Sequence, residues 1–274
     1  MNKTYEVREG QSIALLQELH ILTRDGKMNQ DSRRKLKQVY HLFQFIEPLL
    51  VDAHSRNTDV VLVDHGAGKS YLGFLLYDLF FRESAQEGQV WGIETRQELV
   101  VRSGELAARL GFTGMRFLNQ SVSQSMDSVE LPSRIDIVTA LHACDTATDD
   151  AIRFAIQRAA KHIVLAPCCQ AEVASVLRKN KSKAIHGSSL TELWRHGLHT
   201  REFGSHLTNV LRCLQLESHG YQVTVTELVG WEHSMKNELI VATANGHSGT
   251  KAAKRLTELL DTLGLLEMSE RFFL

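Results

Sequence analysis

One segment, residues 58–70 with the sequence TDVVLVDHGAGKS, constrains the fold more than any other part of the chain. It begins with an aliphatic, mostly β-branched run at 60–63, which is typical of a buried parallel strand. Asp64 follows this run, and Gly66 and Gly68 come shortly before a segment with the spacing of an amphipathic helix. Because glycine has no Cβ, such a loop turns sharply and lets its backbone approach a ligand closely. The segment therefore predicts a strand, a glycine loop over a nucleotide ligand, and a helix.

The glycine loop does not have the spacing of an NTPase. Gly68-Lys69-Ser70 matches the end of the phosphate-binding P-loop, but that motif needs another glycine five residues before Gly68. Val63 occupies that position, inside the predicted strand. The spacing therefore argues against a P-loop enzyme.

A second predicted strand at 89–93 ends on Glu94. An acidic residue at the end of the second strand of a βαβ unit is placed to accept hydrogen bonds from ribose hydroxyls. Beyond it, strands and helices alternate with short connections, as in a parallel sheet with covering helices. Further strands are expected at 115–118, 135–140, 162–166, 221–229 and 238–244. The chain is therefore predicted to have an α/β fold built on a Rossmann-like sheet.

The helical spacing of apolar residues divides the rest of the chain. Helices are expected at 12–25, from 31 to 56, 71–82, 145–160 and 250–265, and one that starts with a capping box of Thr95 and Glu98 and stops at Gly111. With 274 residues, the chain has room for one large domain with appendages. We expect a helical extension at 1–56, a main domain at 57–247 and a C-terminal amphipathic helix at 248–274.

Asp64, the glycine loop and Glu94 together resemble the cofactor site of class I S-adenosylmethionine (SAM) methyltransferases. The resemblance implies a mostly parallel sheet with one antiparallel strand near the C-terminus, and SAM as the cofactor. It also implies that the end of the third strand contacts the adenine, although many class I enzymes carry Asp where this chain has Asn119. The cofactor-binding residues that it implies are Asp64, Gly66, Ala67, Gly68, Glu94, Asn119, Gln120 and Ser121.

Two further motifs, ALHACDTATD at 140–149 and APCCQ at 166–170, follow the predicted fourth and fifth strands. They resemble one branch of the class I enzymes, which includes the methyltransferase-like 25 proteins and the glutathione-S-transferase C-terminal-domain-containing protein. The resemblance implies a substrate side formed by residues of these motifs. They are the catalytic candidates His142, Cys144, Asp145 and Cys168, with Pro167 and Cys169 beside them.

Several roles stay open for these residues. Cys144 and Cys168 could line a pocket, act as a nucleophile and its partner, or bind a metal together with His142. His142 could also be a general base or a hydrogen-bonded structural residue, and Asp145 could cap the following helix. Cys169 could be a small core residue. We expect no metal, because adjacent cysteines are not the usual ligand spacing.

The charge distribution bears on the acceptor. The net charge is only −1, but seven Lys and Arg residues face two Glu residues between Arg178 and Arg212. This basic insertion includes Lys179, Lys181 and Lys183, and the run from Arg33 to Lys37 could extend the same surface. We therefore expect structured RNA, ribosomal or transfer, as the acceptor. A protein or small-molecule acceptor, or a non-catalytic nucleotide-binding module that docks RNA, are the alternatives.

The cysteines and the apolar stretches bear on the compartment. Four cysteines without a CxxC pair are typical of a reducing compartment. The first residues lack the apolar core of a signal peptide, and no stretch has membrane-spanning length. We therefore expect a cytoplasmic protein without a membrane partner, whose oligomeric state is left open.

Overall fold

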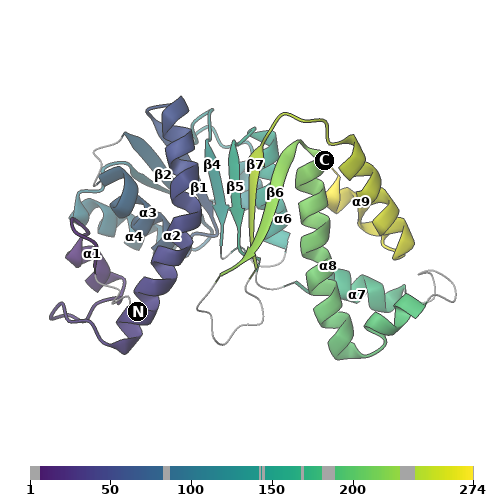
Figure 1. Ribbon diagram of the computed structural model, residues 1–274. Helices are drawn as coiled ribbons and strands as arrows, with labels where there is room; N and C mark the ends of the chain where they lie inside the picture. The colour runs from purple at the N-terminus through teal and green to yellow at the C-terminus, as the bar shows by residue number, and fades with distance from the viewer. Residues whose placement is uncertain are drawn as a thin grey trace.

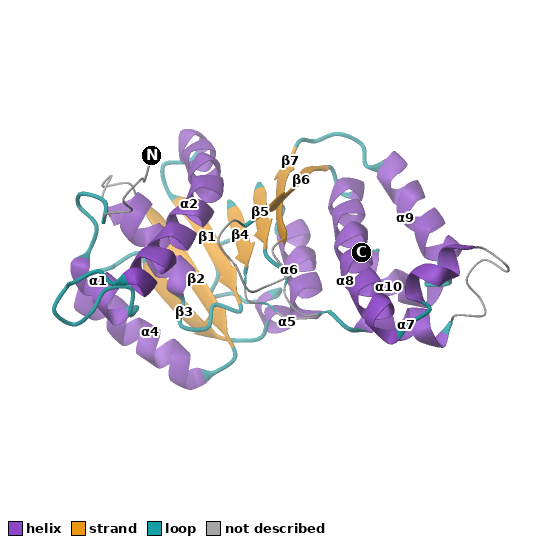
Figure 2. Ribbon diagram, turned by 60° about the horizontal axis from the view of Figure 1, so that its bottom comes forward, coloured by secondary structure: helices purple, strands orange, loops and turns teal. Residues whose placement is uncertain are grey.

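A seven-stranded sheet forms the centre of the molecule, with the strand order β3-β2-β1-β4-β5-β7-β6 (Figures 1 and 2). The computed structural model describes residues 7–82, 87–141, 143, 146–167, 170–180, 189–228 and 238–273. The strands are β1 Val60–His65, β2 Gly88–Glu94, β3 Met115–Asn119, β4 Ile137–Ala140, β5 His162–Leu165, β6 Tyr221–Glu227 and β7 Glu238–Ala244. Neighbouring strands are parallel except that β7 is antiparallel to both β5 and β6. The predicted Rossmann-like sheet, with its antiparallel strand near the C-terminus, is confirmed.

Helices cover the sheet and extend it at one end (Figures 1 and 2). The α-helices are α1 Ile13–Glu18, α2 Gln30–Arg56, α3 Tyr71–Leu76, α4 Gln97–Leu110, α5 Val122–Ser125, α6 Thr146–Gln157, α7 Glu172–Lys179, α8 Gly197–Ser218, α9 Thr250–Thr262 and α10 Ser269–Phe272. A π-helical turn, η1 Tyr77–Arg82, continues α3, and η2 Ser189–Trp194 and η3 Leu266–Met268 are 3₁₀ segments.

The alternation of side chains along β1 explains why the sheet needs helices on both faces. Val60 and Leu62 belong to a core that also contains the buried residues of α2 and α3, whereas Val61 and Val63 belong to a second core with α6. Successive side chains of a strand point to opposite faces, so a continuous apolar strand is stable only when both faces are covered. The run at 60–63 therefore positions the glycine loop at the carboxyl end of a central strand, in a sheet that is buried on both faces.

The start of α4 differs from the sequence-based expectation. Thr95 and Glu98 do not form a capping box, because the N-cap residue is Arg96 and no side chain caps the helix. The Thr95 hydroxyl donates instead to the Glu94 carboxylate at 3.2 Å. Gly111 ends the helix as predicted, with a φ of 69°. The residue that was expected to cap a helix thus belongs to the turn that carries Glu94.

The first predicted helix is also shorter than expected. It ends at Glu18 rather than near residue 25, because the Leu16 carbonyl accepts hydrogen bonds from the N–H groups of both Ile21 and Leu22. These two contacts close the chain into a turn and bury both side chains. The burial of Ile21 and Leu22 in the core with α2 therefore outweighs continuation of the helix.

The segment between β5 and β6 forms a helical unit together with the C-terminal helices. Val173 and Leu177 of α7 share a buried core with Leu211 of α8 and with Leu256 and Leu260 of α9. Figure 2 shows α7, α8, α9 and α10 gathered at one end of the sheet. The described helices of the predicted basic insertion are therefore packed structural elements.

A buried ion pair joins this unit to the rest of the fold. The Arg212 side chain is 1% exposed, and its Nε and Nη2 donate to the two oxygens of Asp149 on α6 at 2.6 and 3.0 Å. Arg271 donates to the same carboxylate at 3.2 Å and to Glu172. The prediction that Arg212 belongs to a basic surface is wrong, because its guanidinium is buried. A buried guanidinium is stable only when it is paired inside the protein, as it is here with Asp149.

The two basic segments also lie apart. The run from Arg33 to Lys37 is on α2, whereas α7 and α8 lie beyond the opposite edge of the sheet in both views (Figures 1 and 2). Within the described residues the two segments therefore do not meet, and RNA binding through them stays a prediction.

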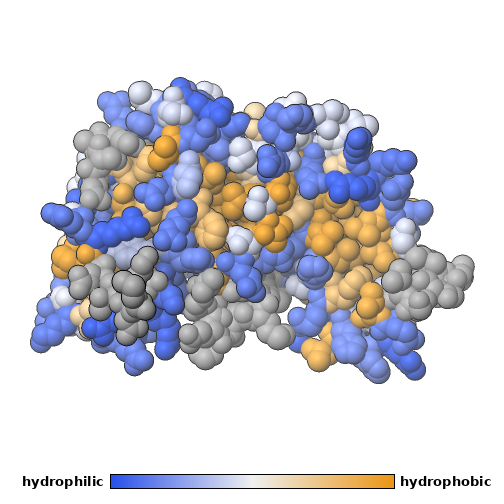
Figure 3. All heavy atoms as spheres, viewed as in Figure 1, coloured by the Kyte–Doolittle hydropathy of each residue, from blue (hydrophilic) through white to orange (hydrophobic). Residues whose placement is uncertain are grey.

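The surface facing the viewer in Figure 3 is apolar over the strands between α2 and α8, and again between α8 and α9.

Within the described residues, no helix is both long enough and apolar enough to cross a bilayer.

We predict that Arg212→Leu destabilises the fold by about 3–5 kcal/mol, because it leaves a buried carboxylate without its main partner. Urea denaturation followed by circular dichroism measures the change. Arg195→Leu is the control, since the Arg195–Glu192 pair is exposed on both sides and its loss should hardly move the midpoint. Equal midpoints for the two variants would contradict the role of the buried pair.

A buried histidine lies directly before the glycine loop. His65 is 0% exposed and packs edge-on against Phe154 with ring centroids 4.5 Å apart. Neither ring nitrogen has a hydrogen-bond partner among the described residues. Burial lowers the pKa of His65 to about 3. The imidazole is therefore neutral in the folded protein at any pH near neutrality.

We predict that His65→Phe makes the protein more resistant to acid. The folded pKa lies below the value of 6.5 in the unfolded chain, so the stability that neutral His65 confers is complete above pH 6.5 and is lost as the pH falls towards 3. The advantage of the variant in unfolding free energy should grow by about 1.4 kcal/mol per pH unit below 6.5. Denaturant titrations at pH 8, 6 and 5 measure it, with the exposed His247→Phe as the control. An advantage that does not depend on pH would contradict the proposed protonation state.

Candidate active site

The glycine loop after β1 is tied to the end of β2 by two hydrogen bonds. The N–H of Ala67 donates to the Ile93 carbonyl at 3.0 Å, and the N–H of Gly68 donates to Glu94 Oε2 at 2.8 Å. Gly66 and Gly68 have φ angles of 65° and 59°, in the left-handed region that favours glycine. The loop therefore needs its two glycines to turn over the end of β2.

Gly66 also permits a close approach of the chain that follows β4. A Cβ at this position would lie 3.3 Å from both Cα and N of Ala143. The strand order reverses between β1 and β4, and ligands of open α/β sheets bind at such a reversal, beyond the carboxyl ends of the strands. The loop, the end of β2 and the residue after β4 therefore converge where a ligand site is expected.

The Glu94 carboxylate is held from several sides. Its Oε1 accepts hydrogen bonds from the backbone N–H and the Nε of Arg96, both at 3.0 Å, and its Oε2 accepts one from Arg96 Nη2 at 3.2 Å in addition to that from Gly68. Burial raises the pKa of Glu94, but the hydrogen bonds from Arg96 and Gly68 outweigh it and lower the pKa to about 2. The carboxylate is therefore ionised, and a hydroxyl ligand has to compete with the 59% exposed Arg96 side chain.

A cavity of about 520 Å³ opens beside this carboxylate. Its volume lies in the range of about 300–1,000 Å³ that is usual for small-molecule sites. The structure brings six of the predicted cofactor residues together on its wall. They are Gly66, Ala67, Gly68, Glu94, Gln120 and Ser121.

The chemistry of this wall fits an adenosine-containing cofactor. Gln120 Oε1 is buried without a hydrogen-bond partner in the described part of the chain, so it can accept a hydrogen bond from an exocyclic amino group. The Glu94 carboxylate can accept hydrogen bonds from ribose hydroxyls. Ser121 is less available, because its hydroxyl already caps α5.

Two predicted cofactor residues, Asp64 and Asn119, are not among the residues that line the cavity. Asp64 is buried, and its Oδ1 accepts a hydrogen bond from the Thr139 hydroxyl at 2.6 Å. Burial raises the pKa of Asp64 to about 7 even though this hydrogen bond opposes the shift. Asn119 Nδ2 donates to the carbonyls of Glu94 and Thr95 at 3.1 and 2.7 Å. Asp64 therefore joins β1 to β4, Asn119 holds the turn after β2, and neither lines the cavity.

Most of the predicted substrate-side residues fall outside the described residues. They are His142, Cys144, Asp145, Cys168, Cys169, Lys181 and Lys183. Lys179 is described and is exposed at the end of α7, with its Nζ 3.9 Å from Glu267 Oε1. In the part of the chain that the structure describes, no group of three His, Cys, Asp or Glu side chains could hold a metal ion.

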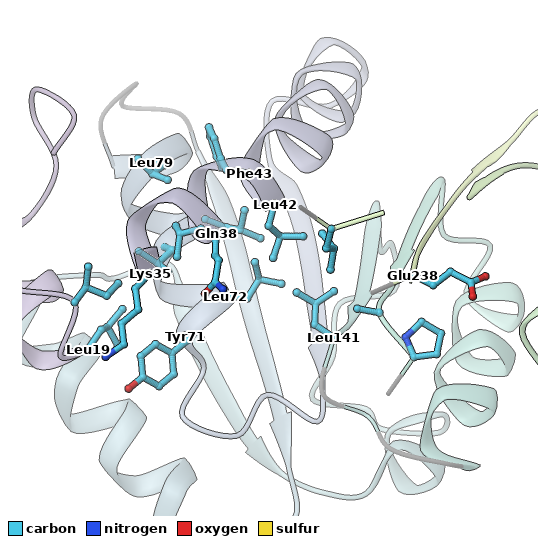
Figure 4. Close-up of a pocket in the computed structure, with 17 residues that line it drawn as sticks. Leu19, Lys35, Gln38, Leu42, Phe43, Tyr71, Leu72, Leu79, Leu141 and Glu238 are labelled. Carbon is cyan, nitrogen blue, oxygen red and sulfur yellow. The ribbon is translucent and has the colours of Figure 1, made fainter. Parts of the chain in front are cut away.

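A second cavity, of about 320 Å³, adjoins the first, and Tyr71 lines both. Figure 4 shows its lining side chains, most of which come from α2, from α3 and from the ends of β4 and β5, with others from the segment after α1, from η1 and from the ends of β6 and β7. Pro167 is among them, as is Leu141, and most of the others are aliphatic. This cavity lies on the side where the resemblance had implied the substrate.

Sequence reasoning missed several residues of the site. Tyr71, Arg96, Ala143 and Asp150 line the cofactor cavity, and Thr139 donates to the buried Asp64. Tyr71 was predicted only as the first residue of a helix, and Arg96 lay between the two residues of the predicted capping box without a role of its own. No local pattern distinguishes these residues, because their role comes from contacts between segments that are distant in the sequence.

Comparison with known proteins places the chain in a family. A family model described as a methyltransferase domain matches residues 34–176, which is more than half of the chain. Among curated proteins, the mouse glutathione S-transferase C-terminal domain-containing protein is 24% identical over 235 residues. That match covers 80% of this chain but only 34% of the relative, so the chain spans about a third of the relative's length.

Solved structures of methyltransferases show a distant likeness. Magnesium protoporphyrin IX methyltransferase from Synechocystis, with bound SAH, has 14% identity and a TM-score of 0.46 and covers 86% of this chain and 95% of its own. An rRNA methylase from Streptococcus thermophilus has 9% identity and a TM-score of 0.45, covering 73% of this chain and 94% of its own. The family match over residues 34–176 confirms the predicted family, and the sheet order with its glycine-loop cavity agrees with it: the chain belongs to the methyltransferase-domain family.

Proposed function

We propose that the chain transfers a methyl group from SAM to an acceptor that enters beside Tyr71, at the carboxyl ends of β4 and β5. The observation that carries this proposal is that Tyr71 lines two cavities of different character. One is bordered by the glycine loop and Glu94, the other is apolar, and Tyr71 belongs to the walls of both. Two ligands held in adjoining cavities meet in a defined orientation, which is the main requirement for a transfer between them.

The residues of the first cavity would bind and orient the cofactor. Glu94 would accept hydrogen bonds from the ribose, Gln120 Oε1 would accept one from the adenine amino group, and the glycine loop would let the backbone approach. When bound, SAM supplies a methyl group that is already activated by the sulfonium. The protein's contribution is therefore largely positioning, and no strong base is required.

Structured RNA is one candidate for the acceptor of the methyl group. The exposed Arg178 and Lys179 at the end of α7 favour it, because lysine and arginine contact phosphates. The support is limited, because Arg195 and Arg201 each pair with a neighbouring carboxylate and Arg212 is buried.

The cysteine content further suggests that the enzyme works in a reducing compartment such as the cytoplasm.

Methyl-labelled SAM and fractionated cell extract test the proposed function. We expect wild-type protein to transfer label and Glu94→Ala to lose most of the transfer. Label that nuclease removes would favour the RNA candidate. Saturable binding of SAM without transfer to any fraction would contradict catalysis and leave a nucleotide-binding module.

We predict opposite behaviour for the two partners of the Glu94–Arg96 pair. Glu94→Ala should weaken SAM binding at least about tenfold, because a charged acceptor of ribose hydroxyls is lost. Arg96→Ala should leave the affinity unchanged or slightly higher, because the Arg96 side chain occupies both carboxylate oxygens. Isothermal titration calorimetry measures both, with Glu98→Ala, in the first turn of α4, as the control. A loss of affinity in Arg96→Ala as large as that in Glu94→Ala would show that Arg96 itself contacts the cofactor.

A further inference from the structure

The apolar cavity of about 320 Å³ has walls on three sides. Leu42 and Phe43 come from α2, and Leu72 and Leu75 come from α3. The third side consists of residues at the ends of the strands, including Leu141 (Figure 4). Because α2 precedes the first strand, the N-terminal helix closes a site whose other walls belong to the methyltransferase sheet.

We propose that this cavity is the acceptor pocket and that it binds a small hydrophobic anion, an acceptor with an apolar body and one acidic group. The proposal rests on the proposed function, because it names the acceptor class for the same site. The apolar body would pack against the aliphatic side chains of the cavity wall. Removal of apolar surface from water is favourable by about 25 cal/mol per Å².

The polar groups of the cavity indicate the charge of its ligand. Lys35 is the one Lys or Arg among the described lining residues, and Figure 4 shows it at the same end of the cavity as Tyr71. The Lys35 Nζ lies 2.8 Å from Asp31 Oδ2 and donates to the His20 carbonyl at 3.2 Å, and its side chain is 43% exposed. An ammonium group has three donors, so an acidic ligand group can also be bound at this end.

The opposite end of the cavity carries a carboxylate. Glu238 lies at the end of the cavity far from Lys35 in Figure 4, and its Oε2 accepts a hydrogen bond from Asn209 Nδ2 at 2.8 Å. A negative charge at this end disfavours a second acidic group on the ligand. The hydrogen-bond donors of Lys35, which Asp31 shares, and the carboxylate of Glu238 at the other end therefore favour a ligand whose acidic group lies towards Lys35 and Tyr71.

The same lining disfavours a nucleobase. Enzymes that hold a flipped base read its polar edge by hydrogen bonds and stack its ring on aromatic side chains. Here most lining residues are aliphatic, and the described aromatic ones are Phe43 and Tyr71. Within the described lining, the aliphatic walls therefore favour an apolar ligand body over a flat polar base.

Calorimetric titration with 1-anilinonaphthalene-8-sulfonate, a hydrophobic anion, tests the proposal on the full chain. We expect saturable binding at one site. Leu72→Trp and Leu42→Trp, which fill the cavity from two different helices, should each abolish it. Lys35→Ala should weaken binding about tenfold, while Lys35→Arg should retain it.

Two control variants separate the cavity from general surface effects. Lys27→Ala removes an exposed lysine with a similar aspartate contact, and Leu198→Trp enlarges an exposed leucine on α8. Neither should change binding of the probe. Circular dichroism of every variant shows that it is folded, so a filled cavity is distinguished from an unfolded chain.

The outcomes separate the pocket from the proposed function. Probe binding that both tryptophan variants leave intact would overturn the pocket, even if wild-type protein binds SAM. If transfer RNA displaced the probe, RNA would be competing for the same cavity, and this result would also overturn the assignment to a small anion. Cavity-dependent probe binding in a wild-type protein that does not bind SAM would support the pocket and contradict the proposed function.

Discussion

The carboxylate of Glu94 is the interaction on which the site depends. It accepts a hydrogen bond from the backbone of the glycine loop after β1 and three from Arg96 after β2, so one buried charge joins two strand ends. The loop in turn allows the chain after β4 to approach to within contact of Gly66. A charged hydrogen-bond acceptor at low exposure is costly unless it is satisfied, which explains why so many donors surround it. Cofactor binding therefore has to exchange donors on a carboxylate that is already satisfied.

The N-terminal helix α2 gives the site its second half. Its apolar side chains pack with those of α3 and of β1, and beyond this contact the same face of α2 lines the cavity next to Tyr71. A helix that covers the sheet thus also decides which acceptor shapes can reach the cofactor. Polar contacts anchor its carboxyl end, where Asp52 accepts a hydrogen bond from the buried His162 of β5 at 2.8 Å if that ring nitrogen carries the proton. The packing of α2 against β5 is therefore fixed by a specific polar contact as well as by apolar burial.

Tertiary packing also changed the meaning of the basic insertion. Counted along the chain, Arg212 adds to a local excess of positive charge, but in space it lies inside the protein against Asp149. The partner is on α6, so no count of neighbouring charges could reveal the pair. Arg195 and Arg201, by contrast, pair with carboxylates only three and one residues away, which a local reading could have noticed. Charge in a sequence indicates a binding surface only where packing leaves it exposed and unneutralised.

The sequence by itself determined the order of the elements, the parallel sheet and the position of the glycine loop, because these follow from local patterns: the apolar run at 60–63, the two glycines and the acid at Glu94. It also identified Gln120 and Ser121, since strand ends meet at one edge of such a sheet. Only the tertiary structure decided that Asp64 joins β1 to β4, that Asn119 supports the turn after β2, that Thr95 bonds Glu94 instead of capping a helix, and that Tyr71 lines two cavities. Each of these depends on which atoms from distant segments compete for one donor, one acceptor or one volume. Local propensity carries no information about that competition, so the fold could be predicted from the sequence and the division of labour within the site could not.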